Sequence, residues 1–263
     1  MGLFILSPVL ILGLPSRYGK AVTRKDPPRR QYRVSSRDSR LMPEQKYSGA
    51  SQVAARSQLY QSFATAFSTP GEEFLDSLMA GEFVDLLVQS GEQLPYSSPF
   101  ANLDPLTGEM SRQEIKVFYS SFFESGIQAV SLRELAYSSL TEKSLLEELF
   151  RFYQHFGLNF SDGELRELPD NLAIELEFMH YLTFLETEAK SAGKENANIK
   201  ALRSAQRDFI NLHPGKWVQP FLARLQSLQN NSVYLDLADL LVHFIDSEQR
   251  FLSDPGNELI ATG

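Results

Sequence analysis

The stretch "RELPDNLAIELEFMHYLTFLE", residues 166–186, predicts the start of a long helix. A Pro-Asp pair precedes an apolar run, and Asp is a preferred N-cap residue because its side chain accepts a backbone N–H. We therefore expect Asp170 to cap a helix over about residues 170–192. Glu175 and Glu177 lie two positions apart, about 200° around a helix, so they cannot hold one ligand side by side. We expect both carboxylates to flank an apolar face.

Helical periodicity continues through most of the chain from Ser51 onward. Ser111 and Glu114 form a capping-box pattern, Gly157 stops one segment, and Pro214 is expected to end another. The predicted helical segments are residues 51–70, 71–91, 111–126, 141–157, 170–192, 195–212, 216–229 and 232–251. Strand-like alternation and internal repeats do not occur in the sequence. The pattern predicts an all-α protein, a single helical-bundle domain of about 8–10 helices.

Two connectors divide this pattern. Residues 92–110 contain three Pro without a period, which predicts a long exposed loop. Residues 158–169, "LNFSDGELRELP", are polar and predict a hinge loop between two helical halves, residues 42–157 and 170–263. Residues 1–41 match no part of the helical pattern, and we expect them to be a disordered or non-native extension.

Charge is distributed unevenly along the chain. Residues 1–41 hold nine Lys/Arg and two Asp, a net charge of +7, which leaves 16 Lys/Arg and 31 Asp/Glu, a net of −15, for the remainder. An acidic body repels phosphate backbones and attracts basic partners, so we expect no nucleic-acid partner. The absence of Cys removes disulfides and thiolate metal sites and fits a reducing compartment.

The N-terminal "MGLFILSPVLILGL" is too short to span a bilayer core of ~30 Å. It lacks the basic region and cleavage site of a secretory signal, so the working chain is expected to begin near Met42. We expect no stable membrane insertion. The alternative is a helical scaffold that docks on an anionic membrane surface through this basic, apolar arm.

Catalytic chemistry finds little support in the sequence. Glu177 and His180 have the Glu-x-x-His spacing of ferritin-like di-iron helices, which would suit a metal-dependent helical oxidoreductase. That site needs a second Glu-x-x-His pair, and the sequence contains none. A Gly-x-Ser-x-Gly nucleophile motif is also absent. We therefore expect the chain not to be an enzyme, with no catalytic residue, no metal and no cofactor of its own.

Four ordered stretches resemble motifs of one known family. "ELPDNLAIELEFMHYL" resembles the Glu-x-Pro-Asp-His-Leu-x-x-Glu-Leu-x-x-Met signature of the TorD/DmsD/NarJ chaperones, which serve molybdenum oxidoreductases of the DMSO reductase type. "RSQLYQSFATAFSTP", "FYSSFF" and "DFINLHPGKWVQPF" are similar to three further segments of that family. The matching residues in these three are Arg56, Leu59, Tyr60, Ala66, Phe67, Pro70, Tyr119, Phe122, Phe123, Phe209, His213 and Trp217.

The resemblance covers roughly residues 52–250 and looks closest to chaperones of the type II branch. It implies a cytoplasmic, all-helical chaperone that binds the apo catalytic subunit of a molybdoenzyme, often through its N-terminal twin-arginine leader, until the molybdopterin cofactor is inserted. It also implies a monomer or a dimer that exchanges halves at the hinge. The leader contacts that it implies here are Asp170, Asn171, Glu167, Tyr119, Phe123, His213 and Trp217.

The chain departs from the family pattern at two positions. Asn171 stands where the signature has His, so this side chain can hydrogen bond but cannot acquire a charge near neutral pH. Pro214 stands where the pattern has Leu, directly after His213. Tyr119, Phe122, Phe123 and Trp217 also have an alternative interpretation, because aromatic residues at helical spacing are commonly part of the core.

Overall fold

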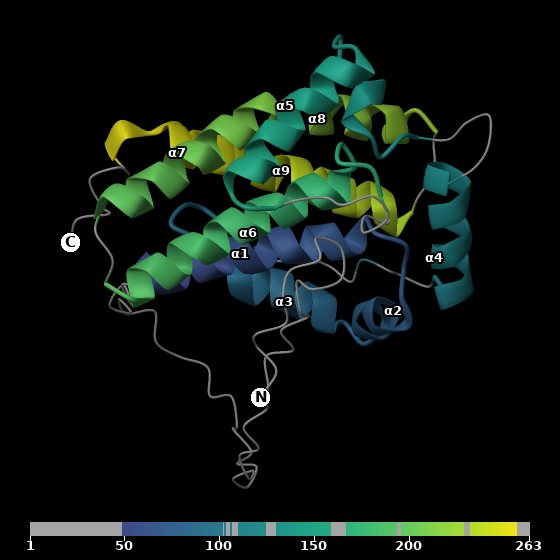
Figure 1. The fold of residues 1–263 in the computed structure, drawn as a ribbon. Coiled ribbons are helices and arrows are strands. Elements are labelled where there is room, and N and C mark those ends of the chain that lie inside the picture. The colour runs from purple at the N-terminus through teal and green to yellow at the C-terminus, as the bar shows by residue number, and fades with distance from the viewer. Residues whose placement is uncertain are drawn as a thin grey trace, which may run out of the picture.

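The computed structural model describes residues 49–101, 103, 106, 110–124, 130–158, 167–193, 196–228 and 232–256. Within these ranges the chain is built from helices and has no strand (Figure 1). The α-helices are α1 (Gly49–Ala66), α2 (Glu72–Met79), α3 (Glu82–Gly91), α4 (Arg112–Tyr119), α5 (Glu142–His155), α6 (Leu172–Ser191), α7 (Asn196–Leu212), α8 (Pro214–Gln226) and α9 (Val233–Ser253). The all-α prediction is confirmed, and most predicted helical segments begin and end within a few residues of these bounds.

Helices α1 and α6 form the centre of the bundle and lie side by side (Figure 1). Buried residues occupy most sides of both helices, as expected for helices surrounded by others. Helices α7, α8 and α9 pack against one another and against this pair. Polar side chains on α1 and α6 therefore point into the protein interior, where each needs a partner.

The boundary between α7 and α8 follows from the Pro at position 214. Pro214 is the first residue of α8, where its missing N–H costs nothing. His213 alone separates the two helices, with φ −120° and ψ −100°, and its side chain is buried. The prediction that Pro214 ends the preceding helix is confirmed, and the turn directs His213 into the core.

Helix α4 stands at the edge of the bundle (Figure 1). Its capping box is confirmed, since Ser111 Oγ accepts from the Glu114 N–H at 3.3 Å and Glu114 Oε2 accepts from the Ser111 N–H at 2.8 Å. Lys116 pairs with Glu72 on α2 at 2.5 Å. A π-helical turn, Ser120–Glu124, continues the helix, and such turns are rare and often functional.

The described part of the loop 92–110 is less exposed than predicted. Leu94 and Phe100 are buried, and the Phe100 ring lies 6.0 Å from that of Phe63 and 6.1 Å from that of Phe244. A Cβ at Gly91 would collide with the Ser98 side chain and the Phe100 ring, so the glycine permits this close return of the chain. The loop therefore closes one end of the core.

The predictions for residues 1–41 and for most of the hinge 158–169 lie outside the described residues. The connector is described at Leu158 and again from Glu167 onward, where the chain leads directly into α6. Among the helices described, none combines the length and apolar character needed to cross a membrane.

Candidate functional site

Helix α6 is capped by Asn171, and the prediction that Asp170 caps it is wrong. Asn171 has extended backbone angles, φ −78° and ψ 139°, and its Oδ1 accepts from the Ala173 N–H at 2.9 Å. Both residue types are good caps, so the local sequence did not distinguish them. The helix begins one residue later than predicted, which frees the Asp170 carboxylate to face another segment.

Asp170 binds the segment that follows the π-helical turn. Its oxygens accept from Arg133 Nε at 3.0 and 3.2 Å and from the Leu135 N–H at 3.3 Å. Backbone bonds lie beside this pair, from the Glu134 N–H to the Asp170 carbonyl and from the Leu172 N–H to the Leu132 carbonyl, each at 2.8 Å. The side chain of Asp170 is fully buried. These contacts fix residues 132–135 against the start of α6.

A second layer of buried polar residues lies behind Asp170. His213 Nδ1 is 2.9 Å from Glu134 Oε2, and Trp217 Nε1 donates to Glu175 Oε2 at 3.0 Å. Burial raises the pKa of Glu175 well above its ordinary value, and the neighbouring Glu134 carboxyl raises it further. The folded protein therefore favours the protonated form of Glu175. The expectation that Glu175 flanks an apolar face at the surface is wrong, because α6 is covered on that side by α8.

The predicted aromatic contacts belong mainly to the core. Tyr119 is buried and donates its hydroxyl to the Phe67 carbonyl at 3.2 Å. Phe123 is half-buried in the π-helical turn, with its ring 5.2 Å from that of Tyr119 and 6.2 Å from that of Phe221. The Trp217 ring lies 6.0 Å from the same Phe221. Phe221 thus lies between the predicted contact residues of the π-helical turn and Trp217 on α8. Among these predicted aromatic contacts, Phe123 is the one whose side chain is partly exposed.

Glu167 forms the exposed edge of the site. Its Oε2 accepts from Asn171 Nδ2 at 3.2 Å, and partial burial together with the nearby Glu124 raises its pKa. The next residue, Leu168, exposes 46% of its surface, which is unusual for a leucine beside a buried network. Of the seven predicted contact residues, only Glu167 and Phe123 present side chains to solvent, whereas Asp170, Asn171, Tyr119, His213 and Trp217 are buried.

An open groove of about 540 Å³ runs beside this network. It lies between the segment after the π-helical turn and α8, and its lining consists of Ser131, Ala136, Tyr137, Pro220, Ala223, Arg224 and Ser227. The Tyr137 ring stacks on Trp217 with a centroid distance of 5.4 Å and an interplanar angle of 14°. The groove wall is therefore continuous with the buried layer that contains Glu175.

Sequence reasoning missed Arg133, Glu134 and Tyr137. The stretch that carries them, "SLRELAY", is irregular apart from a 3-10 turn, Glu134–Ala136, and shows no periodicity that would place it against α6. The sequence did contain one indication of a buried polar contact, an Arg-Glu pair between two leucines. If the leucines are buried, the charged residues between them are drawn toward the interior and need partners there.

The Glu-x-x-His pair does not form a metal site in the part of the chain described. His180 Nδ1 lies 2.9 Å from Ser57 Oγ and is buried against α1. Burial raises the pKa of Glu177 to about 8. Across the described residues, no group of three His, Cys, Asp or Glu side chains is arranged to hold a metal ion.

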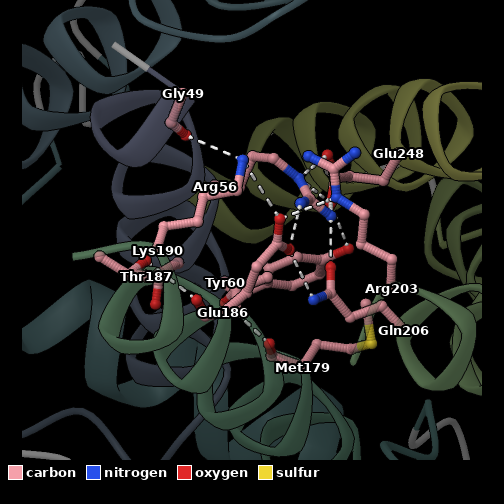
Figure 2. Close-up of polar contacts among 12 residues, drawn as sticks. Gly49, Arg56, Tyr60, Met179, Glu186, Thr187, Lys190, Arg203, Gln206 and Glu248 are labelled. Atoms are coloured by element: carbon pink, nitrogen blue, oxygen red, sulfur yellow. Dashed lines mark hydrogen bonds and ion pairs between the residues drawn. The ribbon is translucent and has the colours of Figure 1, made fainter. Parts of the chain in front are cut away.

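A separate buried network joins four helices and is centred on Arg56 (Figure 2). Arg56 Nε and Nη2 donate to Glu248 on α9 at 2.8 and 2.7 Å, and Nη2 also donates to Gln206 on α7 at 2.8 Å. Arg56 Nη1 lies 3.5 Å from Glu186 on α6, and all four side chains are buried. Arg56 therefore has a structural role, and it lies in the opening helix whose sequence carries part of the resemblance.

Comparisons with known proteins agree with that resemblance. The sequence profile of the nitrate reductase delta subunit family matches residues 106–223. The chain is 29% identical over 153 residues to the selenate reductase assembly chaperone protein of Thauera selenatis, covering 57% of this chain and 76% of that protein. It is 30% identical over 191 residues to the dimethyl sulfide dehydrogenase assembly chaperone protein of Rhodovulum sulfidophilum, covering 66% and 69%.

A third relative is a TorD protein, the type of chaperone after which the family is named. The chain is 25% identical over 208 residues to the chaperone protein TorD of Vibrio parahaemolyticus, covering 75% of this chain and 94% of that protein. These relatives are assembly chaperones and not catalysts, which agrees with the expectation that the chain is not an enzyme. Together with the all-helical fold, they show that the chain belongs to the TorD/NarJ family of molybdoenzyme maturation chaperones.

Proposed function

We propose that the chain binds the apo catalytic subunit of a DMSO-reductase-type molybdenum oxidoreductase in the cytoplasm and holds it until its cofactor is inserted. The names of its relatives support this function, since they assemble selenate reductase and dimethyl sulfide dehydrogenase among other enzymes. These clients also support a type II enzyme as the partner. An acidic body with a net charge of −15 suits a client whose N-terminal leader carries two Arg beside an apolar run.

The observation that carries the placement of the site is the junction of Arg133 with Asp170. This junction ties the signature residues at the start of α6 to residues 131–137, and Ser131, Ala136 and Tyr137 of that segment line an open groove. Glu142, which pairs with Arg133, and Glu167, which bonds to Asn171, carry exposed carboxylates that offer contacts to basic residues. The groove offers apolar area from Ala136 and Pro220 for neighbouring residues of the client.

The buried and exposed members of the site have different roles in this proposal. Glu167, Leu168 and Phe123 contact the client, because their side chains reach solvent. In the free protein, Asp170, Asn171, Tyr119, His213 and Trp217 hold the site in shape, because each is buried. A substitution of a buried member therefore tests folding together with binding, and the exposed members provide the sharper test.

The test is affinity capture from the native host with a tagged chain starting at Met42. The Glu167→Ala/Leu168→Ala double variant is compared with Glu73→Ala/Met79→Ala, which removes an exposed acid and an exposed apolar side chain from α2 instead. We expect the wild type and the α2 variant to recover a molybdoenzyme catalytic subunit that retains its N-terminus. We expect the site variant to lose affinity for it at least about fivefold, the effect of ~1 kcal/mol.

The two parts of the proposal fail differently. Recovery of no molybdoenzyme by the wild-type chain, from cells that express one, would refute the client assignment. Equal recovery by the site and α2 variants, with unchanged circular dichroism, would refute the placement of the site. Native mass measurement of the same preparations distinguishes a monomer from the dimer with exchanged halves, which remains a prediction.

A further inference from the structure

We propose that Asp170 is an exchange site for guanidinium groups, which Arg133 fills in the free protein and an arginine of the client fills in the complex. The inference rests on the proposed function for the identity of the incoming arginine. It assigns Arg133 as an internal substitute for the ligand, and it explains how a fully buried Asp170 can take part in binding.

The geometry of Arg133 favours such an exchange. Its Nε contacts both oxygens of Asp170, while its Nη2 donates to Glu142 Oε1 at 2.8 Å. The exposed fraction is 0% for the Asp170 side chain, 30% for that of Arg133 and 55% for that of Glu142. Arg133 thus runs from the interior to the solvent between two carboxylates. In the proposed exchange, the Arg133 side chain turns outward toward Glu142 and gives up its contacts with Asp170.

The burial of Asp170 requires that a cation remain beside it. The Asp170 side chain is fully buried, and its buried neighbours Glu134 and Glu175 are carboxyl groups that cannot supply a positive charge. An uncompensated carboxylate at this position is costly, so Arg133 does not leave an empty site. Exchange of one guanidinium for another keeps the charge and the planar hydrogen-bonding fork, and an ammonium group does not reproduce that fork. The site therefore selects arginine over lysine.

The groove places the rest of an incoming peptide. Ser131, Ala136 and Tyr137 line it, and these residues flank Arg133 in the chain. Arg224 stands at the opposite wall and disfavours a second cation there. A segment whose arginine occupies Asp170 can thus lay apolar neighbours along Tyr137 and Pro220. Replacing one guanidinium by another changes the electrostatic energy of the site little. The additional contacts in the groove therefore supply the binding free energy.

Chemical rescue tests the site without any client. Arg133→Ala removes the internal guanidinium, and we expect 10 mM ethylguanidinium to raise its melting temperature by about 4 °C or more through specific binding. Ethylammonium at the same concentration should give no comparable rise. Wild type and Arg112→Ala, which removes an arginine from the exposed α2–α4 contact, should respond to neither compound. Equal effects of both compounds, or no effect, would overturn the exchange site.

A peptide assay tests the competition. The probe is a synthetic 20-residue peptide with an Arg-Arg pair followed by an apolar run, and its matched form carries Lys-Lys. We expect Arg133→Ala to bind the arginine peptide about tenfold tighter than wild type, because the competing side chain is gone. Unchanged or weaker binding by this variant would show that Arg133 is an ordinary structural or client-contacting residue, and would overturn the inference.

A second variant covers the case in which Arg133→Ala does not fold. Arg133→Gln retains a donor for Asp170 but no charge, so we expect rescue in the same direction but of smaller size, and the same order of peptide affinities. Failure of rescue with a folded variant refutes the exchange site whether or not a client is captured. Failure of the capture experiment refutes the proposed function and leaves the rescue result interpretable.

Discussion

Glu175 makes the stability of this protein depend on pH in a predictable direction. Its carboxyl group is buried between Trp217 and Glu134, and its pKa in the folded protein lies well above the ordinary value of 4.5. Where the pH exceeds 4.5, the unfolded chain releases this proton while the folded chain retains it. The contribution of Glu175 to folding stability therefore falls as pH rises from 4.5 toward the folded pKa.

The substitution that isolates this effect is Glu175→Gln. The Gln side chain is neutral at every pH, it can still accept from Trp217 Nε1, and its amide can donate to the Glu134 carboxyl. A full proton difference is worth ~1.4 kcal/mol per pH unit, and relaxation of the interior reduces this value. We expect the stability of the variant relative to wild type to increase by about 0.5–1.4 kcal/mol per pH unit above pH 4.5.

The assay is urea denaturation followed by circular dichroism at pH 5, 6 and 7. The difference between the two proteins cancels the titrating groups that do not interact with Glu175, so it reports Glu175 together with its neighbour Glu134. Glu147→Gln, which neutralises an exposed carboxylate on α5, serves as the matched control. A constant difference between wild type and Glu175→Gln across the three pH values would refute the reasoning. A variant that becomes relatively less stable toward pH 7 would show that the folded protein prefers the ionised carboxylate.

Three further predictions concern stability. Arg56→Met should lower the free energy of unfolding by about 3–5 kcal/mol at pH 7, because it leaves Glu248 buried without its cation, as urea denaturation can measure. Asn171→Ala should cost ~1 kcal/mol and Asn171→Ser less, since serine also caps and adds no charge, and melting curves of the pair would check this order. Glu177→Gln should gain stability over wild type between pH 4.5 and about 8, the folded pKa of Glu177, and denaturation at pH 5 and 7 would show a gain that increases with pH.

The helices could be predicted because their signals are local. The capping box at Ser111, Gly157 after α5 and Pro214 at the start of α8 each act within a few residues of their own position. The capping residue of α6 could not be chosen in this way. Asp170 and Asn171 are both suitable N-cap residues. The Asp170 carboxylate is instead bound by Arg133, which lies 37 positions away in the sequence, and Asn171 therefore caps the helix.

Burial of polar residues was the main feature that the sequence did not reveal. Carboxylates on a helix usually face solvent, so the sequence pattern predicts the same for Glu175. The periodicity of α6 cannot show that this helix lies in the middle of the bundle, because that depends on the packing of α1, α7 and α8 around it. For the same reason, the sequence predicts an exposed loop around Phe100, although the Phe100 ring is buried at the end of the core.

The two halves predicted from the hinge depend on each other energetically. Helix α1 of the first half packs along α6 of the second, and Arg56 is paired with Glu248 near the end of the chain. The groove is formed in the same way, with Tyr137 from one half stacked on Trp217 from the other. Removal of either half would leave these apolar and charged surfaces unpaired, so we expect neither half to be stable alone. A client bound between Tyr137 and α8 would therefore bridge the two halves and favour the arrangement in which they are joined.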